Sequence, residues 1–404
     1  MAVLRTFDSN VRCVGVDAAA VSDFLNSNGI SLRDDSEYVV FPGFCDVHVH
    51  FREPGFSYKE TIVGGSSCAA AGGYTAVCTM PNLKPVPDSF EHIKQQLDII
   101  DRDAVIKTIP YGSISVEQRG EALSDMDKLA EWVCAFSDDG KGVQDDELML
   151  RAMGKAKSLG KLIVAHCEDE RLLEGGYIHK GEYALRHGHR GISSESEYMQ
   201  LKRDLELVKE SGCAYHACHL STKESMELIR SAKREGLDVS CETAPHYFLL
   251  CDEDLQEEGR FKMNPPLRSK EDMLAVRKAL LDGTVDMIAT DHAPHSAEEK
   301  GRGLEKSAMG VIGLECAFPM VYTELVKTGL MSEQQLCRLM SEAPRSRFNI
   351  PAEADFAVFE VSREYMLEPE NFQGMGRATP FAGRKVFGRC VLTVYNNKVV
   401  FNRV

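Results

Sequence analysis

The stretch CDVHVHFREPG, residues 45–55, places two histidines one residue apart at the end of an apolar run. Side chains two residues apart in a β-strand point to the same side. His48 and His50 can therefore direct two imidazoles at one point, and Arg52 comes next on that face. Two ordinary histidines near a strand end are the alternative interpretation, and the rest of the chain decides between the two.

Apolar segments and helix-like segments alternate along most of the chain. The first predicted strand lies within VVFPGFCDVHV (39–49), and seven more follow at 75–80, 104–109, 133–137, 161–165, 213–220, 238–243 and 286–290. Charged segments with apolar i, i+3, i+4 spacing predict helices at 145–160, 193–212, 222–236 and 270–283. Apolar strands that alternate with helices indicate a parallel sheet buried on both faces. This α/β pattern favours a closed (β/α)8 TIM-type barrel, with an open doubly wound sheet as the alternative.

The two ends of the chain have a different pattern and predict a second, smaller unit. Residues 350–404 alternate apolar and polar side chains around the turn signal Asn396-Asn397, which is typical of an antiparallel hairpin. We expect residues 41–348 to form the barrel. Residues 1–40 and 349–404 would form the two parts of a small antiparallel β domain.

Composition excludes several classes of protein. The formal net charge of −15 over 404 residues argues against a nucleic-acid-binding surface. An uninterrupted apolar run of about 18 residues, which a membrane span requires, does not occur. The N-terminus lacks the apolar centre of a signal peptide, and thirteen cysteines without framework spacing are typical of reduced thiols. We therefore expect a cytoplasmic protein.

Metal-type side chains gather where predicted strands end. His166 and His219 each end one strand, Asp291 ends the last, and the pair Asp138-Asp139 follows the fourth. In such barrels the active site lies at the carboxyl ends of the strands. Zn²⁺ prefers imidazole and carboxylate ligands. The residues thus predict a two-metal site in which His48, His50 and Asp291 hold one ion and His166 and His219 the other, with one of the two aspartates between them.

Three further polar residues near these ends are candidates for substrate contacts. Arg52 can pair with a carboxylate through its planar fork, although a surface salt bridge is the alternative. Asn82 and Asn264 could bind a substrate or merely stabilise turns beside the prolines that flank them. The charged segment 296–310 is interpreted as a mobile flap or as a solvated loop.

Other polar residues receive structural interpretations. His216 is out of phase with His219 and is expected to face the helices or a neighbouring strand. His246 is assigned a structural role. Cys218 is expected to point away from the site, to the opposite face of its strand.

Five motifs together resemble the dihydroorotases of the amidohydrolase superfamily, in particular the bacterial long-chain kind related to allantoinases and dihydropyrimidinases. They are HVHFREPG (48–55), MPN (80–82), DDG (138–140), NPPLR (264–268) and TDHAPH (290–295). The resemblance spans roughly residues 40–390. The sequence departs from the family pattern in its short N-terminal region and in Asn82-Leu83-Lys84-Pro85, which replaces the familiar Asn-Thr-x-Pro.

The resemblance implies a role for each residue of the site. His48, His50 and Asp291 would bind the first Zn²⁺, and His166 and His219 the second. In aspartate-bridged relatives the second acid of the pair is the ligand, which implies that Asp139 bridges the two ions of each subunit. The substrate's carboxylate would be surrounded by Arg52, Asn82, Asn264 and His295.

The implied reaction is the reversible conversion of (S)-dihydroorotate and water to N-carbamoyl-L-aspartate, a step of de novo pyrimidine (UMP) biosynthesis. A metal-bridging hydroxide would attack the cyclic amide, and Asp291 would act as general base and then general acid. The alternatives are an allantoinase or dihydropyrimidinase that acts on an uncharged ring, and a non-catalytic scaffold. We also expect a homodimer, and a contact with another enzyme of the pathway.

Overall fold

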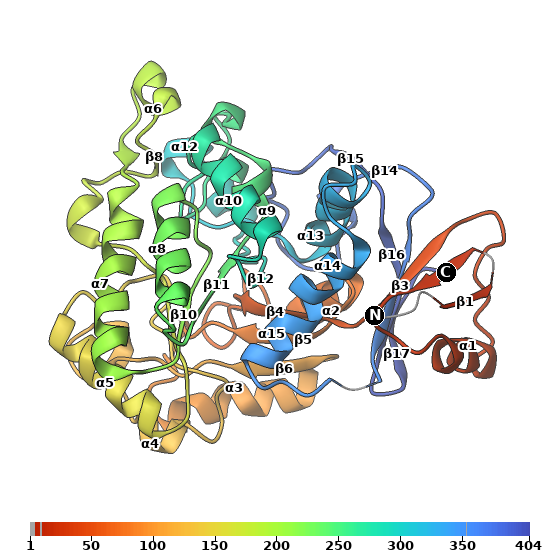
Figure 1. Cartoon of the computed structure of the whole chain (residues 1–404), viewed down its shortest axis with the longest axis horizontal. Helices are drawn as coiled ribbons and strands as arrows, with labels where there is room; N and C mark the ends of the chain where they lie inside the picture. Colours follow the sequence, from red (N-terminus) through yellow and green to blue (C-terminus); the bar gives the residue numbers. More distant parts are fainter. Residues whose placement is uncertain (1–4, 9, 353) are drawn as a thin grey trace.

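The computed structural model describes residues 5–8, 10–352 and 354–404, with parallel strands at the centre and helices outside them (Figure 1). One parallel sheet has the order β4-β5-β6 and consists of β4 (Phe44–Val49), β5 (Tyr74–Thr79) and β6 (Lys107–Pro110). A second has the order β12-β11-β10-β7 and consists of β7 (Ile163–Ala165), β10 (Tyr215–Ala217), β11 (Val239–Thr243) and β12 (Met287–Ile288). The expected α/β architecture with parallel strands is confirmed.

The predicted fourth strand is reduced to a single bridging residue. Phe136 forms isolated parallel bridges to Gly112 and to Ile163. The backbone around it still pairs with both neighbours, since Ser137 N donates to Gly112 O at 2.9 Å and Val164 N donates to Phe136 O at 2.9 Å. Val49 and His292 form a similar parallel bridge. The parallel strands therefore form two sheets, β4-β5-β6 and β12-β11-β10-β7, which isolated bridges connect.

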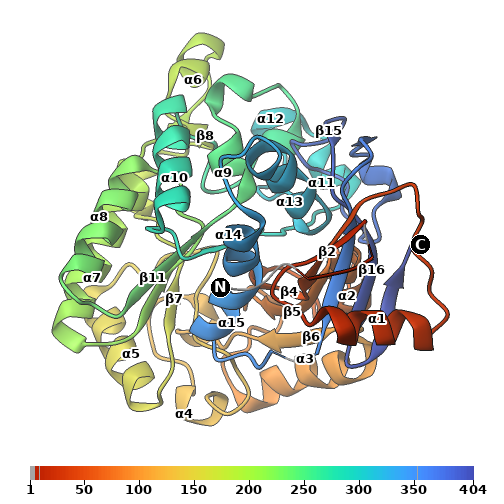
Figure 2. The same ribbon diagram turned by 45° about the vertical axis from the view of Figure 1, so that its right-hand side comes forward.

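The four helices predicted from their spacing are present. They are α5 (Asp146–Ser158), α7 (Glu195–Ser211), α8 (Lys223–Arg234) and α10 (Lys270–Asp282). Asp145, Thr222 and Ser269 cap three of them with side-chain oxygens, which satisfy backbone N–H groups of the first turn. Figure 2 shows α7, α8 and α10 on the outer side of β11.

Further helices and short strands complete the chain. The remaining α-helices within the barrel region are α2 (Ile62–Ala71), α3 (Phe90–Asp103), α4 (Met126–Leu129), α6 (Glu182–His187), α9 (Pro245–Leu249), α11 (Ala297–Lys300), α12 (Gly303–Lys306), α13 (Leu314–Val321), α14 (Glu333–Cys337) and α15 (Ala343–Arg347). Four two-residue strands form the pairs β8 (Ile178–His179) with β9 (Gly191–Ile192) and β14 (Tyr365–Met366) with β15 (Lys385–Val386).

The chain ends build a separate six-stranded sheet with the order β1-β2-β3-β13-β16-β17. Its strands are β1 (Arg5–Asp8), β2 (Val11–Cys13), β3 (Tyr38–Pro42), β13 (Phe356–Glu360), β16 (Arg389–Tyr395) and β17 (Lys398–Asn402). The prediction of a purely antiparallel unit is wrong for one pair, because β2 and β3 run parallel. Helix α1 (Ala18–Ser27) connects these two strands, and a crossover of this kind is what a parallel pair requires. The predicted hairpin joins β16 and β17.

Gly43 separates the terminal sheet from the barrel strands within one continuous apolar run. A Cβ at this position would lie 2.1 Å from Thr75 Oγ1, so the close approach of the two strands requires glycine. The segment expected as one strand is therefore split into β3 and β4. The domain boundary placed after residue 40 falls inside β3; the division into domains stays a prediction.

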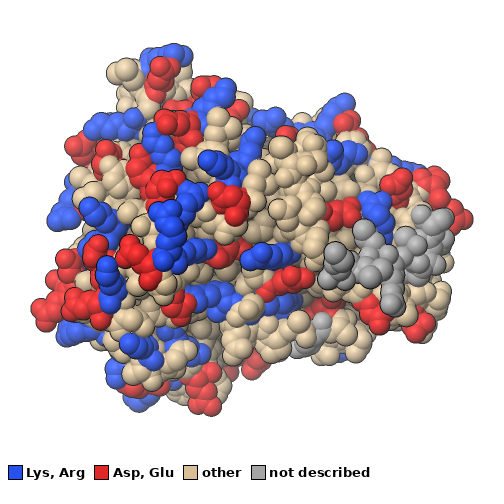
Figure 3. Space-filling view, in the orientation of Figure 1, with Lys and Arg blue, Asp and Glu red and all other residues tan. Residues whose placement is uncertain are grey.

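The surface shown in Figure 3 carries interspersed acidic and basic side chains. Within the described residues, no helix has the length and apolar character needed to cross a membrane. All thirteen cysteines lie in this described part as free thiols, and twelve of them are buried.

Candidate metal centre

The three predicted ligands of the first ion lie together. Asp291 Oδ1 is 3.1 Å from His50 Nε2 and 3.6 Å from His48 Nε2. All three side chains are buried. Two imidazole nitrogens and a carboxylate oxygen at these distances can share one cation.

The two predicted ligands of the second ion form a neighbouring group. His166 Nδ1 lies 3.0 Å from His219 Nε2. Asp139 Oδ1 is 3.7 Å from the first of these nitrogens and 3.6 Å from the second. The donor atoms again come from different strand ends, and His219 belongs to the loop between β10 and α8.

Asp139 lies between the two groups, whereas Asp138 does not. Asp139 Oδ1 is 3.2 Å from His48 Nε2, and its Oδ2 is 3.4 Å from His50 Nε2. Asp138 turns away and accepts hydrogen bonds from the backbone of Ile114 and from the backbone and hydroxyl of Ser115. The geometry thus favours Asp139 as the bridging ligand.

Unusual backbone conformations hold three of the predicted site residues. Arg52, His219 and Asp291 have positive φ angles of 59°, 31° and 49°. Such conformations cost a non-glycine residue about 1–3 kcal/mol, and they concentrate at functional sites. The fold therefore holds these side chains in place at the expense of local strain.

The charges of the cluster favour a cation at its centre. Burial would raise the pKa of Asp291, but the hydrogen bond to His50 and the nearby His48 hold this pKa below its ordinary value. Burial would lower the pKa of His48, yet Asp139 raises it well above the usual range. The carboxylates thus stay ionised and stabilise positive charge between them.

Unpartnered polar atoms test whether the residues fit a metal. His48 Nε2 and Asp139 Oδ1 are buried and make no hydrogen bond to any described residue. A buried polar atom without a partner is costly and uncommon. Both atoms face the shared centre, where a divalent cation would satisfy them, so the donor set fits a metal.

Glu242 is a residue of the site that the sequence analysis missed. Its Oε1 lies 2.6 Å from His48 Nδ1, and its Oε2 lies 3.1 Å from His216 Nε2. His216 Nδ1 in turn lies 2.7 Å from Ser240 Oγ, so the expectation that His216 faces a neighbouring strand agrees with its contacts. Histidine contacts hold the pKa of Glu242 at about 2 despite burial. An ionised carboxylate on Nδ1 keeps the proton there and leaves Nε2 as the ligand atom.

This role of Glu242 predicts a loss of metal affinity. We expect Glu242→Gln to weaken metal binding by about 10- to 100-fold, because a neutral amide accepts the Nδ1 proton less strongly. Metal retained after dialysis against increasing chelator, measured by mass spectrometry, gives the affinity. Glu227→Gln on the exposed side of α8 is the matched control. Equal retention in the two variants would show that Glu242 does not support His48.

Cys218 was expected to point away from the site, but its side chain lies beside residues of the metal centre. Its sulfur lies in one group with ligand atoms of His48 and Glu242, all within 4.8 Å of one another. Burial raises the pKa of this thiol well above its ordinary value and keeps it neutral. Cys218 therefore packs beside the first group as a small neutral side chain.

The predicted substrate-binding residues occupy two sides of the metal centre. Arg52 is buried, its Nε donates to Pro294 O at 3.2 Å, and its guanidinium lies 3.4 Å from His295 Nε2. Asn82 Oδ1 lies 2.9 Å from His50 Nδ1. Asn264 is placed differently, with its Nδ2 donating to Glu168 Oε1 at 2.9 Å. Arg52 thus lies next to His295. Asn82 contacts the proposed ligand His50, and Asn264 contacts Glu168.

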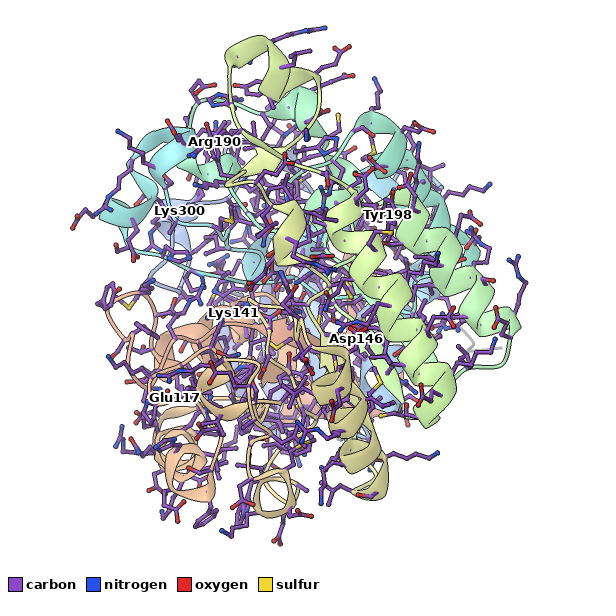
Figure 4. The ribbon with its side chains drawn as sticks, turned by 90° about the vertical axis from the view of Figure 1, so that its left-hand side faces the viewer. Glu117, Lys141, Asp146, Arg190, Tyr198 and Lys300 are labelled. Carbon is purple, nitrogen blue, oxygen red and sulfur yellow. The ribbon has the colours of Figure 1, made fainter. Side chains whose placement is uncertain are left out.

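The charged segment 296–310 is anchored to the protein rather than being a solvated loop. Lys300 is buried within it, and burial lowers the pKa of its amine to about 7. Its Nζ donates to three backbone oxygens, those of Lys262 at 3.0 Å, Ala308 at 2.8 Å and Gly310 at 2.6 Å. Figure 4 shows Lys300 above Lys141, which belongs to the loop that follows Asp139. The segment therefore contacts the chain near Asn264 through Lys300 and Lys262, and it contacts His295 through the backbone oxygen of Met309.

Comparisons with known proteins identify relatives over nearly the whole chain. The dihydro-orotase-like family model matches residues 37–225. A dihydroorotase of Fusobacterium nucleatum subsp. nucleatum is 47% identical over 389 residues, which cover 94% of this chain and 92% of the relative. A dihydroorotase of Bacillus thuringiensis (strain Al Hakam) is 43% identical over 394 residues, which cover 95% and 92%.

Solved structures share the fold. An L-hydantoinase (dihydropyrimidinase) from Arthrobacter aurescens aligns with a TM-score of 0.80 and 24% identity, over 91% of this chain and 86% of that one. A dihydropyrimidinase from Brevibacillus agri NCHU1002 aligns with a TM-score of 0.77 and 21% identity, over 92% and 88%. At this level of identity the likeness concerns the arrangement of the chain.

Proposed function

The chain belongs to the dihydroorotase family, and from this we infer that it interconverts (S)-dihydroorotate and N-carbamoyl-L-aspartate in pyrimidine biosynthesis. The observation that carries the proposal is the buried Arg52, with the half-buried His295 next to it, beside a cluster of metal-type ligands. A cationic fork next to a metal centre suits a cyclic amide that carries a carboxylate. The hydantoinase-like fold alone would not select such a substrate.

The metal centre is proposed to hold two Zn²⁺ ions bridged by Asp139. His48, His50 and Asp291 would bind one ion, and His166 and His219 the other. Bound there, the metals would lower the pKa of a water molecule to about 7 and polarise the amide carbonyl. The isolated bridges at Phe136 and between Val49 and His292 support a further proposal, that the two parallel sheets close into one barrel around this centre.

Asp291 is proposed to move the proton of the reaction. Its Oδ1 lies 3.1 Å from His50 Nε2, at the centre of the cluster, where a carboxylate can reach both the attacking water and the leaving nitrogen. It would take the proton of the attacking water and then deliver it to the ring nitrogen as the amide bond breaks. In the direction of ring closure the same carboxylate would carry out these transfers in reverse order.

Arg52 is proposed to bind the substrate's carboxylate. We expect Arg52→Met to raise KM for dihydroorotate by about 10- to 100-fold with a smaller effect on kcat, because a charge-assisted pair is lost in both ground and transition states. Steady-state kinetics with Arg102→Met, an exposed surface residue, as the matched control give both constants. An unchanged KM would remove Arg52 from this role.

The substrate is tested by assaying the purified protein with dihydroorotate, N-carbamoyl-aspartate, allantoin and dihydrouracil. The proposal predicts that kcat/KM for dihydroorotate exceeds that for the two uncharged rings by at least about 100-fold, the discrimination that one buried ion pair provides. A preference for allantoin or dihydrouracil would identify a different cyclic amidohydrolase. Inactivity with all four compounds in the metal-loaded protein would indicate a scaffold.

The assembly and location of the protein are also proposals. We infer a homodimer in the cytoplasm, in contact with another enzyme of pyrimidine biosynthesis. The first part is tested by light scattering of the purified protein, which should give twice the chain mass of 44.9 kDa.

A further inference from the structure

Lys59 lies in the loop between β4 and α2, and its side chain contacts His295. Its Nζ is 3.2 Å from His295 Nδ1 and 3.0 Å from Glu299 Oε1. Only 14% of the lysine side chain is exposed. The sequence analysis assigned no role to this residue, which follows the HVHFREPG motif by four positions. The ammonium is therefore held between a carboxylate and the imidazole that lies next to Arg52.

The neighbours of His295 determine which ring nitrogen carries its proton. A lysine ammonium only donates hydrogen bonds, so the Nδ1 atom that faces Lys59 must be the unprotonated nitrogen. Nε2 then carries the proton, and it lies 2.7 Å from the backbone oxygen of Met309, which only accepts. Glu299 Oε2 is farther from Nδ1, at 3.5 Å, and it already accepts from the backbone N–H of Ser296. The contacts of both ring nitrogens thus favour the same tautomer.

The ring of His295 is neutral in these surroundings. Burial, together with the nearby charges of Arg52, Lys59 and Lys300, lowers the pKa of the imidazole to about 3. At neutral pH the ring therefore carries a single proton, and either nitrogen can hold it. Which nitrogen does so depends on the hydrogen bonds that the ring makes.

The position of this proton affects the donors of Arg52. Arg52 Nη2 lies 3.4 Å from His295 Nε2, and Arg52 Nε donates to Pro294 O at 3.2 Å. An unprotonated Nε2 would accept a hydrogen bond from the guanidinium and occupy one of its donors. A protonated Nε2 cannot accept, so the terminal nitrogens of Arg52 keep their donors for a carboxylate.

We propose that Lys59 is a positioning residue, which fixes the proton of His295 on Nε2 and thereby keeps the guanidinium of Arg52 available for the substrate's carboxylate. The consequence for the carboxylate rests on the proposed function, whereas the tautomer of His295 does not depend on any substrate. Lys59 acts through His295 and does not itself contact the substrate.

The tautomer is tested by ¹⁵N NMR of the Zn²⁺-loaded protein labelled at its histidine rings. Protonated and unprotonated nitrogens of a neutral imidazole give well-separated ¹⁵N shifts, and the signals of His295 are those that His295→Gln lacks. In the wild-type protein we expect the proton on Nε2. In Lys59→Met we expect it mainly on Nδ1, because Glu299 loses its cationic partner and a carboxylate is a stronger acceptor than the Met309 carbonyl.

Glu299→Gln separates the tautomer from the ion pair. This substitution removes the charge that pairs with Lys59 but leaves the ammonium beside His295 Nδ1. Glutamine can also complete the capping box that Glu299 forms with Ser296. We therefore expect the proton of His295 to stay on Nε2 in this variant.

The consequence for Arg52 is tested by steady-state kinetics with dihydroorotate. In Lys59→Met we expect KM to rise about tenfold with a smaller change in kcat, because a charge-assisted contact to the carboxylate is weakened in both ground and transition states. Lys59→Arg should restore most of the lost affinity, since a guanidinium also only donates to Nδ1. Lys94→Met on the exposed side of α3 is the matched control and should leave both constants unchanged.

Three results would overturn the inference. They are a proton on Nδ1 of His295 in the wild-type protein, a proton that stays on Nε2 in Lys59→Met, and a proton that moves in this variant while KM is unchanged. Failure of the proposed function is a separate outcome. If the wild-type protein does not turn over dihydroorotate, that function is wrong, and the NMR measurement still decides whether Lys59 fixes the tautomer of His295.

Discussion

Replacing Asp291 with asparagine should lower kcat for dihydroorotate by about 10³-fold or more, since proton transfer by a positioned carboxylate contributes about 10²–10⁴-fold. Asparagine keeps the size of the side chain and an oxygen near His50 but cannot accept the proton. The loss should appear in both directions of the reaction, because the same group would act as base in one and as acid in the other. Initial rates of hydrolysis and of ring closure measure it.

Controls must separate this loss from unfolding and from loss of metal, because Asp291 is also a proposed ligand. Asp103→Asn at the exposed end of α3 provides the matched surface change. Circular dichroism and metal analysis should show that Asp291→Asn is folded and retains at least the ion of the second group. A folded, metal-loaded variant with more than about a tenth of normal kcat would exclude Asp291 as the general base.

The adjacent acids Asp138 and Asp139 should respond in opposite ways to the same substitution. Asp139→Asn removes the charge shared by both groups of ligands, and we expect the metal content to fall by at least one ion per chain and kcat by about 10³-fold. Asp138→Asn should leave the metal content intact, because this side chain accepts from Ile114 and Ser115 instead. It should lower the free energy of unfolding by about 1–3 kcal/mol, since the amide nitrogen of asparagine cannot accept the hydrogen bond that the buried Ser115 hydroxyl donates to Asp138 Oδ2.

Metal analysis together with urea unfolding of both variants distinguishes the two acids. The reverse pattern, in which Asp138→Asn loses metal and Asp139→Asn retains it, would place the bridge at the first acid of the pair. Equal metal content in both variants would mean that neither acid is a bridging ligand.

The alternation of apolar strands and amphipathic helices could be read from the sequence because it depends on local spacing. Buried parallel strands are apolar on both faces, and helices such as α8 carry an apolar stripe that marks their length. The segment around Phe136 did not become a regular strand although it is equally apolar. Its pairing depends on neighbours more than twenty residues away, which local spacing does not specify.

The terminal sheet was harder to predict for the same reason. The short strands β1 and β2 pair next to β3, which in turn pairs with β13, more than 300 residues later in the chain. No local sequence pattern predicts the pairing of β3 with β13. The parallel direction of β2 and β3 follows from the helix between them, a helix that the sequence analysis did not identify.

The site was predictable where a simple rule placed residues at strand ends. That rule brought His48, His50, His166, His219 and Asp291 to one centre, and their distances agree with this grouping. The sequence analysis did not identify Glu242, because this residue lies inside an apolar strand and its role depends on a contact with His48, 194 residues away. The partnership of Glu168 with Asn264 spans 96 residues and was equally invisible. Roles that depend on such contacts emerge only from the folded chain.

The most direct test of the central claim is a metal titration of the purified protein. Zn²⁺ is added to chelator-treated, folded protein while turnover of dihydroorotate is followed. Turnover should be absent without metal, should rise with added Zn²⁺, and should reach its maximum at two ions per chain. Full turnover of dihydroorotate by protein that contains less than one-tenth of an ion per chain would contradict the account.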